Sequence, residues 1–100
     1  MNRLYKVRLE KPAQKSLKKM DQNDAKIIMA WISKNLVDCE DPYLHGKALQ
    51  GDLKGKWRYR VGNYRLIAHI DNENVIILVL VIGHRREIYN LDSTSVLQKA

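Results

Sequence analysis

One hundred residues are enough for one compact domain over residues 1–100 and too few for two. The hydrophobic share of 45% and the charged share of 29% are ordinary for a folded protein, so the composition does not indicate a disordered chain. No apolar run is suited to span a bilayer or to form a signal peptide, so the sequence predicts a cytoplasmic domain and not a membrane protein. The formal charge of +7 and the pI near 9.7 predict an anionic partner, without choosing between nucleic acid, an acidic protein and a membrane surface.

The chain is expected to start with a strand and a basic helix. Residues 4–9 alternate in polarity, and Pro12 suits the first turn of a helix. One face of this helix is apolar and carries Ala13, Leu17 and Met20. Another face carries Lys11, Lys15, Lys18 and Lys19. The spacing of these lysines fits a solvated surface and a surface that follows a phosphate backbone equally well.

A second helix is expected to begin at Asp21 or Asn23, either of which can cap its N-terminus. Its apolar residues recur at helical spacing, with Trp31 at the edge of the stripe. They are Ala25, Ile28, Met29, Ile32 and Leu36. Such a stripe is typical of a helix that packs on a core rather than of a cofactor site.

Residues 38–55 are predicted to be a long connection, because they hold Pro42 and three of the five glycines. Long ordered connections in small domains often carry function. The single Cys39 lies among three carboxylates, which would raise the pKa of its thiol, so a surface or half-buried, unreactive cysteine is expected. A lone cysteine forms neither an internal disulfide nor a cysteine-based zinc site, and it fits a reducing compartment.

The second half of the chain predicts three strands, over residues 57–61, 64–71 and 75–83. A Gly-Asn turn joins the first two strands, and a polar turn at residues 72–74 joins the last two. Residues 75–82 are apolar on both faces, which predicts a central strand covered on each side, with the helices on one of them. Residues 90–100 are predicted to form a short helix.

Three arginines are expected on one face of the first hairpin. A two-residue turn at residues 62–63 places Arg60 directly opposite Arg65, with Arg58 on the same side. Like charges directly opposite each other destabilise a ladder, and residues 54–70 contain no acid to compensate them. A bound phosphate fits this requirement, and acids from distant segments are the alternative. The other face is expected to pack on the helices through Trp57, Tyr59, Val61, Tyr64, Leu66, Ala68 and Ile70.

The segment after the last strand adds a titratable imidazole, two guanidinium groups and a ring that can stack on a base. These groups belong to His84, Arg85, Arg86 and Tyr89. Alternation counted from an Ile70–Val75 pair puts His84 on the face of Arg65, whereas a bulge at Gly83 would put Arg85 there, and the sequence leaves both open.

Other chemistry finds little support in the sequence. His45 and His69 are expected to be structural, since one lies in the long connection and the other far along its strand from Arg60. No metal-ligand spacing, serine nucleophile motif or glycine-rich phosphate loop occurs, so chemistry without a metal or cofactor is expected.

Two of these motifs together resemble the RelE family of toxins, within the RelE/ParE superfamily. They are Gly-Lys-Trp-Arg-Tyr-Arg-Val-Gly-Asn-Tyr-Arg at residues 55–65 and Gly-His-Arg-Arg-Glu-Ile-Tyr at residues 83–89. The strand, the helix pair and the His-Gly-Lys-Ala-Leu loop at residues 45–49 are also similar, so the resemblance covers nearly all of the chain except the tail after Leu91. It implies an α+β fold of the microbial RNase type, in which two N-terminal helices pack on one face of a twisted, mainly antiparallel sheet.

The resemblance also implies an activity and partners. Such toxins belong to type II toxin–antitoxin systems and inhibit translation by cutting messenger RNA in the ribosomal decoding site, with the substrate 2′-hydroxyl as nucleophile. A flexible, partly acidic antitoxin holds them inactive, and the pair binds its operator DNA through the antitoxin. The implied partners are therefore the antitoxin, messenger RNA and ribosomal RNA, and no membrane.

Site roles carry over residue by residue. Arg58 and Arg60 match the basic pair before the turn. Arg65 matches the arginine that stabilises charge on phosphorus, Arg85 the one near the leaving oxygen, and Tyr89 the stacking ring. The remaining candidate RNA-binding residues are Lys56, Arg86, Lys15, Lys18 and Lys19.

The proton carrier is the role for which this sequence departs from the family pattern. A guanidinium stays protonated, so Arg60, which stands where family members carry a lysine, suits a general base poorly. An imidazole is the side chain that most often transfers protons near neutral pH, so we hypothesise that His84 is the acid or base.

Two alternatives remain. A ParE-like toxin shares the fold but blocks DNA gyrase without nuclease residues, and the arginine hairpin together with Tyr89 argues against it. The second alternative is a non-enzymatic module that binds nucleic acid through the lysines of residues 11–19. It predicts salt-sensitive binding without cleavage of the nucleic acid, and it leaves the cluster of arginines at the hairpin unexplained.

Overall fold

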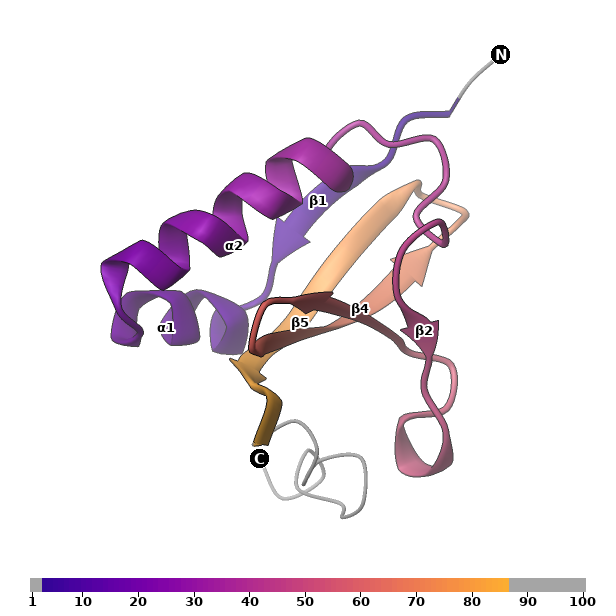
Figure 1. Ribbon diagram of the computed structural model, residues 1–100. Helices are drawn as coiled ribbons and strands as arrows, with labels where there is room; N and C mark the ends of the chain where they lie inside the picture. The colour runs from indigo at the N-terminus through magenta and orange to yellow at the C-terminus, as the bar shows by residue number, and fades with distance from the viewer. Residues whose placement is uncertain (1–2, 87–100) are drawn as a thin grey trace.

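The computed structural model describes residues 3–86, which form one five-stranded mixed sheet with two helices on one face (Figure 1). The elements are β1 (Lys6–Leu9), α1 (Lys11–Lys19), α2 (Gln22–Asn35), β2 (Lys47–Ala48), the 3₁₀ helix η1 (Gly51–Leu53), β3 (Trp57–Val61), β4 (Tyr64–Asp71) and β5 (Ile76–His84). The strand order is β1-β5-β4-β3-β2, with β1 parallel to β5 and the other neighbours antiparallel. This confirms the predicted α+β class. The helix expected over residues 90–100 lies outside the described residues.

The two helices begin where the sequence predicts. Pro12 lies in the first turn of α1. The carboxylate of Asp21 accepts a hydrogen bond of 3.0 Å from the backbone N–H of Asn23, so Asp21 and not Asn23 caps α2. No helix within residues 3–86 is long and apolar enough to cross a membrane.

The apolar face of α2 is narrower than predicted. Ile28, Ile32 and Leu36 are almost fully buried, whereas Met29 is 38% exposed, so its placement in the core is wrong. Each residue turns a helix by about 100°, so residues four positions apart, such as 28, 32 and 36, lie on nearly the same side of the helix, and this side is buried. Met29 therefore falls outside it.

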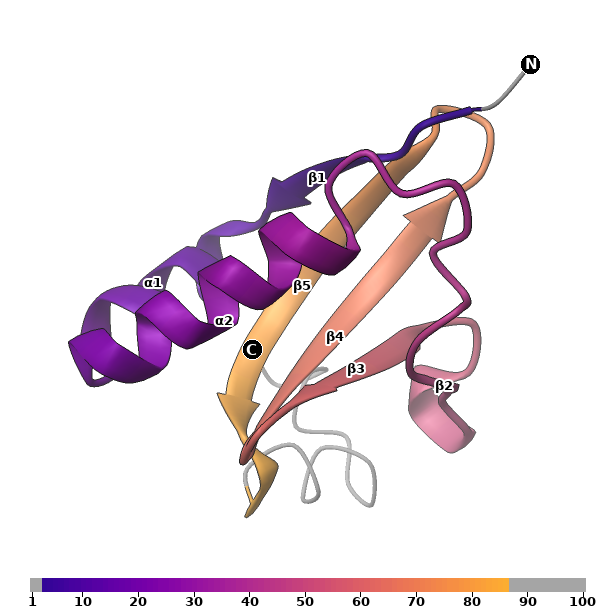
Figure 2. The same cartoon turned by 45° about the horizontal axis from the view of Figure 1, so that its top comes forward.

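The core lies between the helices and one face of the sheet (Figure 2). Ala13 of α1 packs there with the predicted apolar face of the hairpin. Tyr59 is its largest fully buried side chain, and the hydroxyl group donates a hydrogen bond of 2.6 Å to the carbonyl of Pro42. Full burial of such side chains stabilises a fold by about 1.5–3 kcal/mol each. The predicted core side of the hairpin is confirmed.

The β3–β4 register is as predicted. Val61 pairs with Tyr64 and Arg60 with Arg65, across a turn in which Gly62 has a φ of 59°. The core side and the arginine side of the hairpin follow directly from this pairing, because side chains alternate between the two faces of a strand.

The β4–β5 register differs from the count made on the sequence. Val75 has a φ of 59° in the turn, so Ile70 pairs with Ile77 and not with Val75. A second irregularity follows, because Ile67 pairs with Val81 and Ala68 with Val79, which leaves Leu80 as an extra residue in β5. The resulting bulge reverses the alternation.

The bulge decides which face His84 joins. Tyr64 pairs with His84, and Arg65 pairs with Gly83. Of the two placements that the sequence leaves open, the one with His84 on the face of Arg65 is therefore wrong, and the bulge that reverses the alternation lies at Leu80 rather than at Gly83.

Residues 38–55 form more than a connection. β2 pairs with β3 at the sheet edge opposite β1 (Figure 1), and η1 follows it. Leu49 and Leu53 pack on Ile67 and Val81, on the face away from the helices. This small second apolar cluster covers part of the face that the helices leave open. Within the sheet, β5 lies between β1 and β4, so it has a strand on each side.

Candidate functional site

The face of the hairpin away from the helices carries three arginines. We call it the arginine face and define it by Arg58, Arg60 and Arg65. Arg60 is exposed and directly opposite Arg65, and Arg58 lies opposite Ile67. Arg58 and Arg65 are half-buried. The predicted clustering of the three arginines on one face is confirmed.

Arg65 is held at the end of the hairpin. Its Nη1 atom donates to the carbonyl oxygens of Gly62 and Tyr64, at 3.5 and 3.3 Å. Both distances exceed the usual range for N–H···O hydrogen bonds, so these two contacts by themselves orient the guanidinium group only weakly.

A fourth cation joins this face from β2. Lys47 pairs with Arg58 across the β2–β3 ladder, and its side chain is exposed. Two cross-strand pairs of like charge, Lys47–Arg58 and Arg60–Arg65, therefore lie side by side. Four cations gathered on one face are suited to bind phosphates. Sequence reasoning did not single out Lys47, because no local signal marks a strand of two residues.

The loop before β2 fixes this arrangement. Gly46 has a φ of 86°, and a Cβ atom there would collide with the carbonyl oxygen of Arg58 and lie 2.7 Å from Nε1 of Trp57. That Nε1 donates a hydrogen bond of 2.6 Å to the carbonyl of His45. The imidazole of His45 meets the ring of Trp31 edge-on, at 5.8 Å between centroids. His45 therefore has the packing role that its place in the connection predicts.

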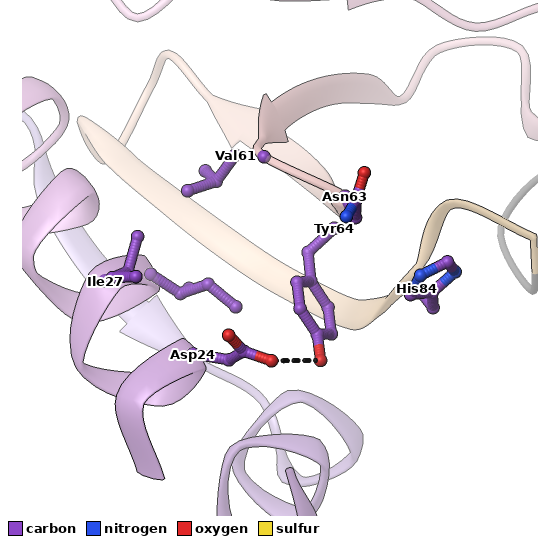
Figure 3. A pocket seen from close by; sticks show the side chains of 8 residues that line it. Asp24, Ile27, Val61, Asn63, Tyr64 and His84 are labelled. Carbon is purple, nitrogen blue, oxygen red and sulfur yellow. Dashed lines mark hydrogen bonds between the residues drawn. The ribbon is translucent and has the colours of Figure 1, made fainter. Parts of the chain in front are cut away.

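The hairpin tip is tied to α2 on the helix side of the sheet (Figure 3). The hydroxyl group of Tyr64 donates a hydrogen bond of 2.9 Å to the carboxylate of Asp24. A hollow of about 260 Å³ lies beside this bond, lined by Asp24, Ile27, Ile28, Val61, Gly62, Asn63, Tyr64 and His84.

His84 belongs to this side of the molecule. Its ring meets the ring of Tyr64 edge-on at 5.7 Å, and its Nδ1 accepts a hydrogen bond of 3.4 Å from the backbone N–H of Arg86. It also lines a second hollow, of about 460 Å³, with Ser16, Lys19 and Met20 of the α1 end. The structure thus places His84 beside Tyr64 at the strand end and separates it from the arginine face.

The other predicted residues lie in three places. The backbone N–H of Arg85 donates a hydrogen bond of 2.6 Å to the carbonyl of Asn63, which brings Arg85 next to the hairpin turn, and Arg85 and Arg86 are both exposed. Lys56 is half-buried just before β3. The exposed lysines of α1, which are Lys15, Lys18 and Lys19, lie in the helical layer on the other side of the sheet from the arginine face. Tyr89 lies outside the described residues.

The remaining titratable candidates form no second centre. Cys39 is half-buried, and burial, followed by the negative charge of Asp41, raises the pKa of its thiol, as expected. His69 lies in β4 opposite Leu78, with Nδ1 buried and without a hydrogen-bond partner in residues 3–86. No group of three or more His, Cys, Asp or Glu side chains in these residues could hold a metal ion.

Comparison with known proteins shows the family to which this chain belongs. Residues 7–89 match the family described as "ParE toxin of type II toxin-antitoxin system, parDE". Toxin RelG of Mycobacterium tuberculosis is 31% identical over 85 residues, which are 85% of this chain and 95% of that protein.

Solved structures agree with the sequence matches. The RelBE2 toxin–antitoxin complex of M. tuberculosis has a chain that superposes with a TM-score of 0.74 at 28% identity, covering 81% of this chain and 91% of that one. The isolated RelE toxin of E. coli shares the fold, with a TM-score of 0.64 at 20% identity over 92% of this chain and 98% of that chain. The chain described here therefore belongs to the RelE/ParE superfamily of type II toxin–antitoxin toxins.

Proposed function

We propose that the chain is a ribosome-dependent endoribonuclease that cuts messenger RNA on its arginine face and so inhibits translation. The observation that carries the proposal is the strand register, which places Arg60 opposite Arg65 and Lys47 opposite Arg58 on one face of the sheet. The four cations that these pairs gather on one face suit the binding of an RNA phosphate. The names of the relatives, RelG and RelE, support the same choice within the superfamily.

The proposed reaction is an internal phosphoryl transfer. The 2′-oxygen of the substrate forms a bond to the adjacent phosphorus, and the bond from phosphorus to the 5′-oxygen breaks. A base takes the 2′-hydroxyl proton, and an acid gives a proton to the leaving oxygen, so the products are a 2′,3′-cyclic phosphate and a 5′-hydroxyl. Such a reaction depends chiefly on positioning and on cations near the developing charge.

The residues divide this work among them. In our proposal, Arg65 stabilises the charge on phosphorus, Arg85 stabilises the leaving oxygen, and Tyr89 stacks on a base. Arg58 and Arg60 hold the neighbouring phosphates. The remaining RNA-binding side chains are Lys56, Arg86, Lys15, Lys18 and Lys19, of which the last three contact RNA from the helical layer.

The group that carries the proton is Arg60 or His84, and the two lie on different faces of the sheet. Arg60 is a poor base because its guanidinium group stays protonated. His84 remains the proposed acid or base, and because it lies beside Tyr64, this role requires the substrate strand to pass the end of the hairpin. His84 then acts from the helix side, while the arginines act from the other face.

We also propose an antitoxin as the partner that silences the toxin. Solved relatives include the RelBE2 toxin–antitoxin complex of M. tuberculosis and the archaeal RelE–RelB complex of Pyrococcus horikoshii. The charge of +7 suits a partly acidic partner. Contact with operator DNA is proposed only through the antitoxin.

A second candidate is a gyrase-blocking toxin, which the ParE description of the matching family favours. A cell-free translation reaction that contains gyrase and plasmid separates the two. Message broken within codons supports the nuclease, whereas intact message together with gyrase trapped on DNA supports the blocker.

A further inference from the structure

We propose that the loop between β2 and β3 forms a nucleotide subsite beside the arginine face, in which Gln50 reads a base edge and Lys47 binds the attached phosphate. This inference rests on the proposed RNA cleavage and deepens it by naming a residue that sets sequence preference. Its starting point is a hollow of about 320 Å³ at this sheet edge, lined by Ala48, Leu49, Gln50, Gly51 and Arg58.

The loop is built as a firm wall. The backbone N–H of Leu49 donates a hydrogen bond of 3.1 Å to the carbonyl of Lys56, which closes the base of the loop. Within the loop, the N–H of Lys54 donates a hydrogen bond of 3.1 Å to the carbonyl of Gly51. Leu49 and Leu53 are buried against Ile67. A subsite on such a wall needs little ordering when a ligand binds, which favours affinity.

The lining suits one nucleotide. Gln50 is exposed, and its carboxamide offers both donors and an acceptor, as recognition of a base edge requires. None of the five lining residues is acidic, and Arg58, which holds a neighbouring phosphate in the proposed reaction, borders the hollow. The volume is at the lower end of the range of small-molecule sites, roughly 300–1,000 Å³.

The position continues the track of cations. Arg58 and Arg60 are two residues apart on β3, which is about 6.6 Å at a rise of roughly 3.3 Å per residue. Lys47 stands across the ladder from Arg58, one strand nearer to the sheet edge. A strand of RNA whose cleaved phosphate lies at Arg65, with neighbouring phosphates at Arg60 and Arg58, therefore meets Lys47 and the hollow next.

The test compares sites of cleavage in translated message by sequencing the new 5′ ends. For Gln50→Ala and Gln50→Glu, cutting continues and the preference at one base beside the scissile bond changes by about three- to tenfold, as for the loss of one or two hydrogen bonds. For Lys47→Gln, the cleavage rate falls several-fold at unchanged base preference, and its salt dependence becomes shallower. Thermal melting of each variant checks that the fold is kept.

Matched controls come from the exposed part of α2. Gln22→Ala and Lys26→Gln alter an exposed glutamine and an exposed lysine in the helical layer, and both are expected to cut like the parent. An unchanged base preference in folded Gln50→Ala overturns the subsite while the proposed function stands. A parent protein that cuts no message overturns the proposed function, and the subsite with it.

Discussion

The hydroxyl group of Tyr64 donates a hydrogen bond of 2.9 Å to Asp24, and so ties the tip of the arginine hairpin to α2 (Figure 3). Tyr64 precedes Arg65 in β4 and pairs with His84 of β5. The bond therefore fixes the end of the hairpin that lies next to both Arg65 and His84. We expect it to serve both stability and the proposed reaction.

Tyr64→Phe removes this bond while keeping the ring. Because it leaves a carboxylate without its donor, the free energy of unfolding is expected to fall by about 1–2 kcal/mol. Urea unfolding measures the loss. Asp24→Asn keeps an acceptor oxygen and should lose less. Equal stability of Tyr64→Phe and the parent would show that the tie contributes nothing.

Arg60→Gln separates stability from activity. Removal of one charge from the Arg60–Arg65 pair is expected to raise the free energy of unfolding by about 0.2–1 kcal/mol at low salt, while RNA cleavage falls. The stability gain should shrink at high salt, where charges are screened. Arg8→Gln, an exposed arginine of β1 opposite Leu78, is the control without this gain. A loss of stability in Arg60→Gln instead would mean that Arg60 is paired with an acid.

His84→Gln tests the proton carrier. A general acid or base contributes about 10²–10⁴-fold, so single-turnover cleavage of ribosome-bound message is expected to slow by that factor. His45→Gln is the matched control, since His45 packs on Trp31. If His84→Gln cuts as fast as the parent, His84 carries no proton in the reaction.

Gly46→Ala tests how the loop holds β2 against β3. Its φ of 86° and the collision of a Cβ atom with Arg58 predict a loss of about 1–3 kcal/mol of stability. Gly55→Ala is the matched control, because it also has a positive φ but meets no atom within 4 Å. Urea unfolding should show a larger loss of unfolding free energy for Gly46→Ala than for Gly55→Ala. Equal losses would show that the positive φ alone accounts for the effect and that the collision with Arg58 contributes nothing.

Local chemistry explains what the sequence predicts well. The Gly-Asn turn sets the hairpin register by itself, so the pairing of Arg60 with Arg65 follows from nearby residues. The cap at Asp21 and the helix start at Pro12 are local in the same way.

The features that the sequence does not predict depend on distant contacts. β5 is apolar on both faces, so a slip of one residue leaves its pattern unchanged, and the bulge at Leu80 has no signature. β2 is followed by Leu49 and Leu53, which pack on Ile67 of β4, a contact that the local sequence does not reveal. For this reason the arginine face was predictable, whereas the side of His84 and the place of Lys47 were not.

The central claim is that RNA is cut on the arginine face, and mapping new 5′ ends after brief expression tests it most directly. The parent is compared with Arg65→Ala and with Lys34→Ala, a change at the C-terminal end of α2. We predict cuts within codons of translated message for the parent and Lys34→Ala, and their loss in folded Arg65→Ala. Cuts by Arg65→Ala at the parent's rate, or intact message in cells that the parent arrests, would contradict the claim.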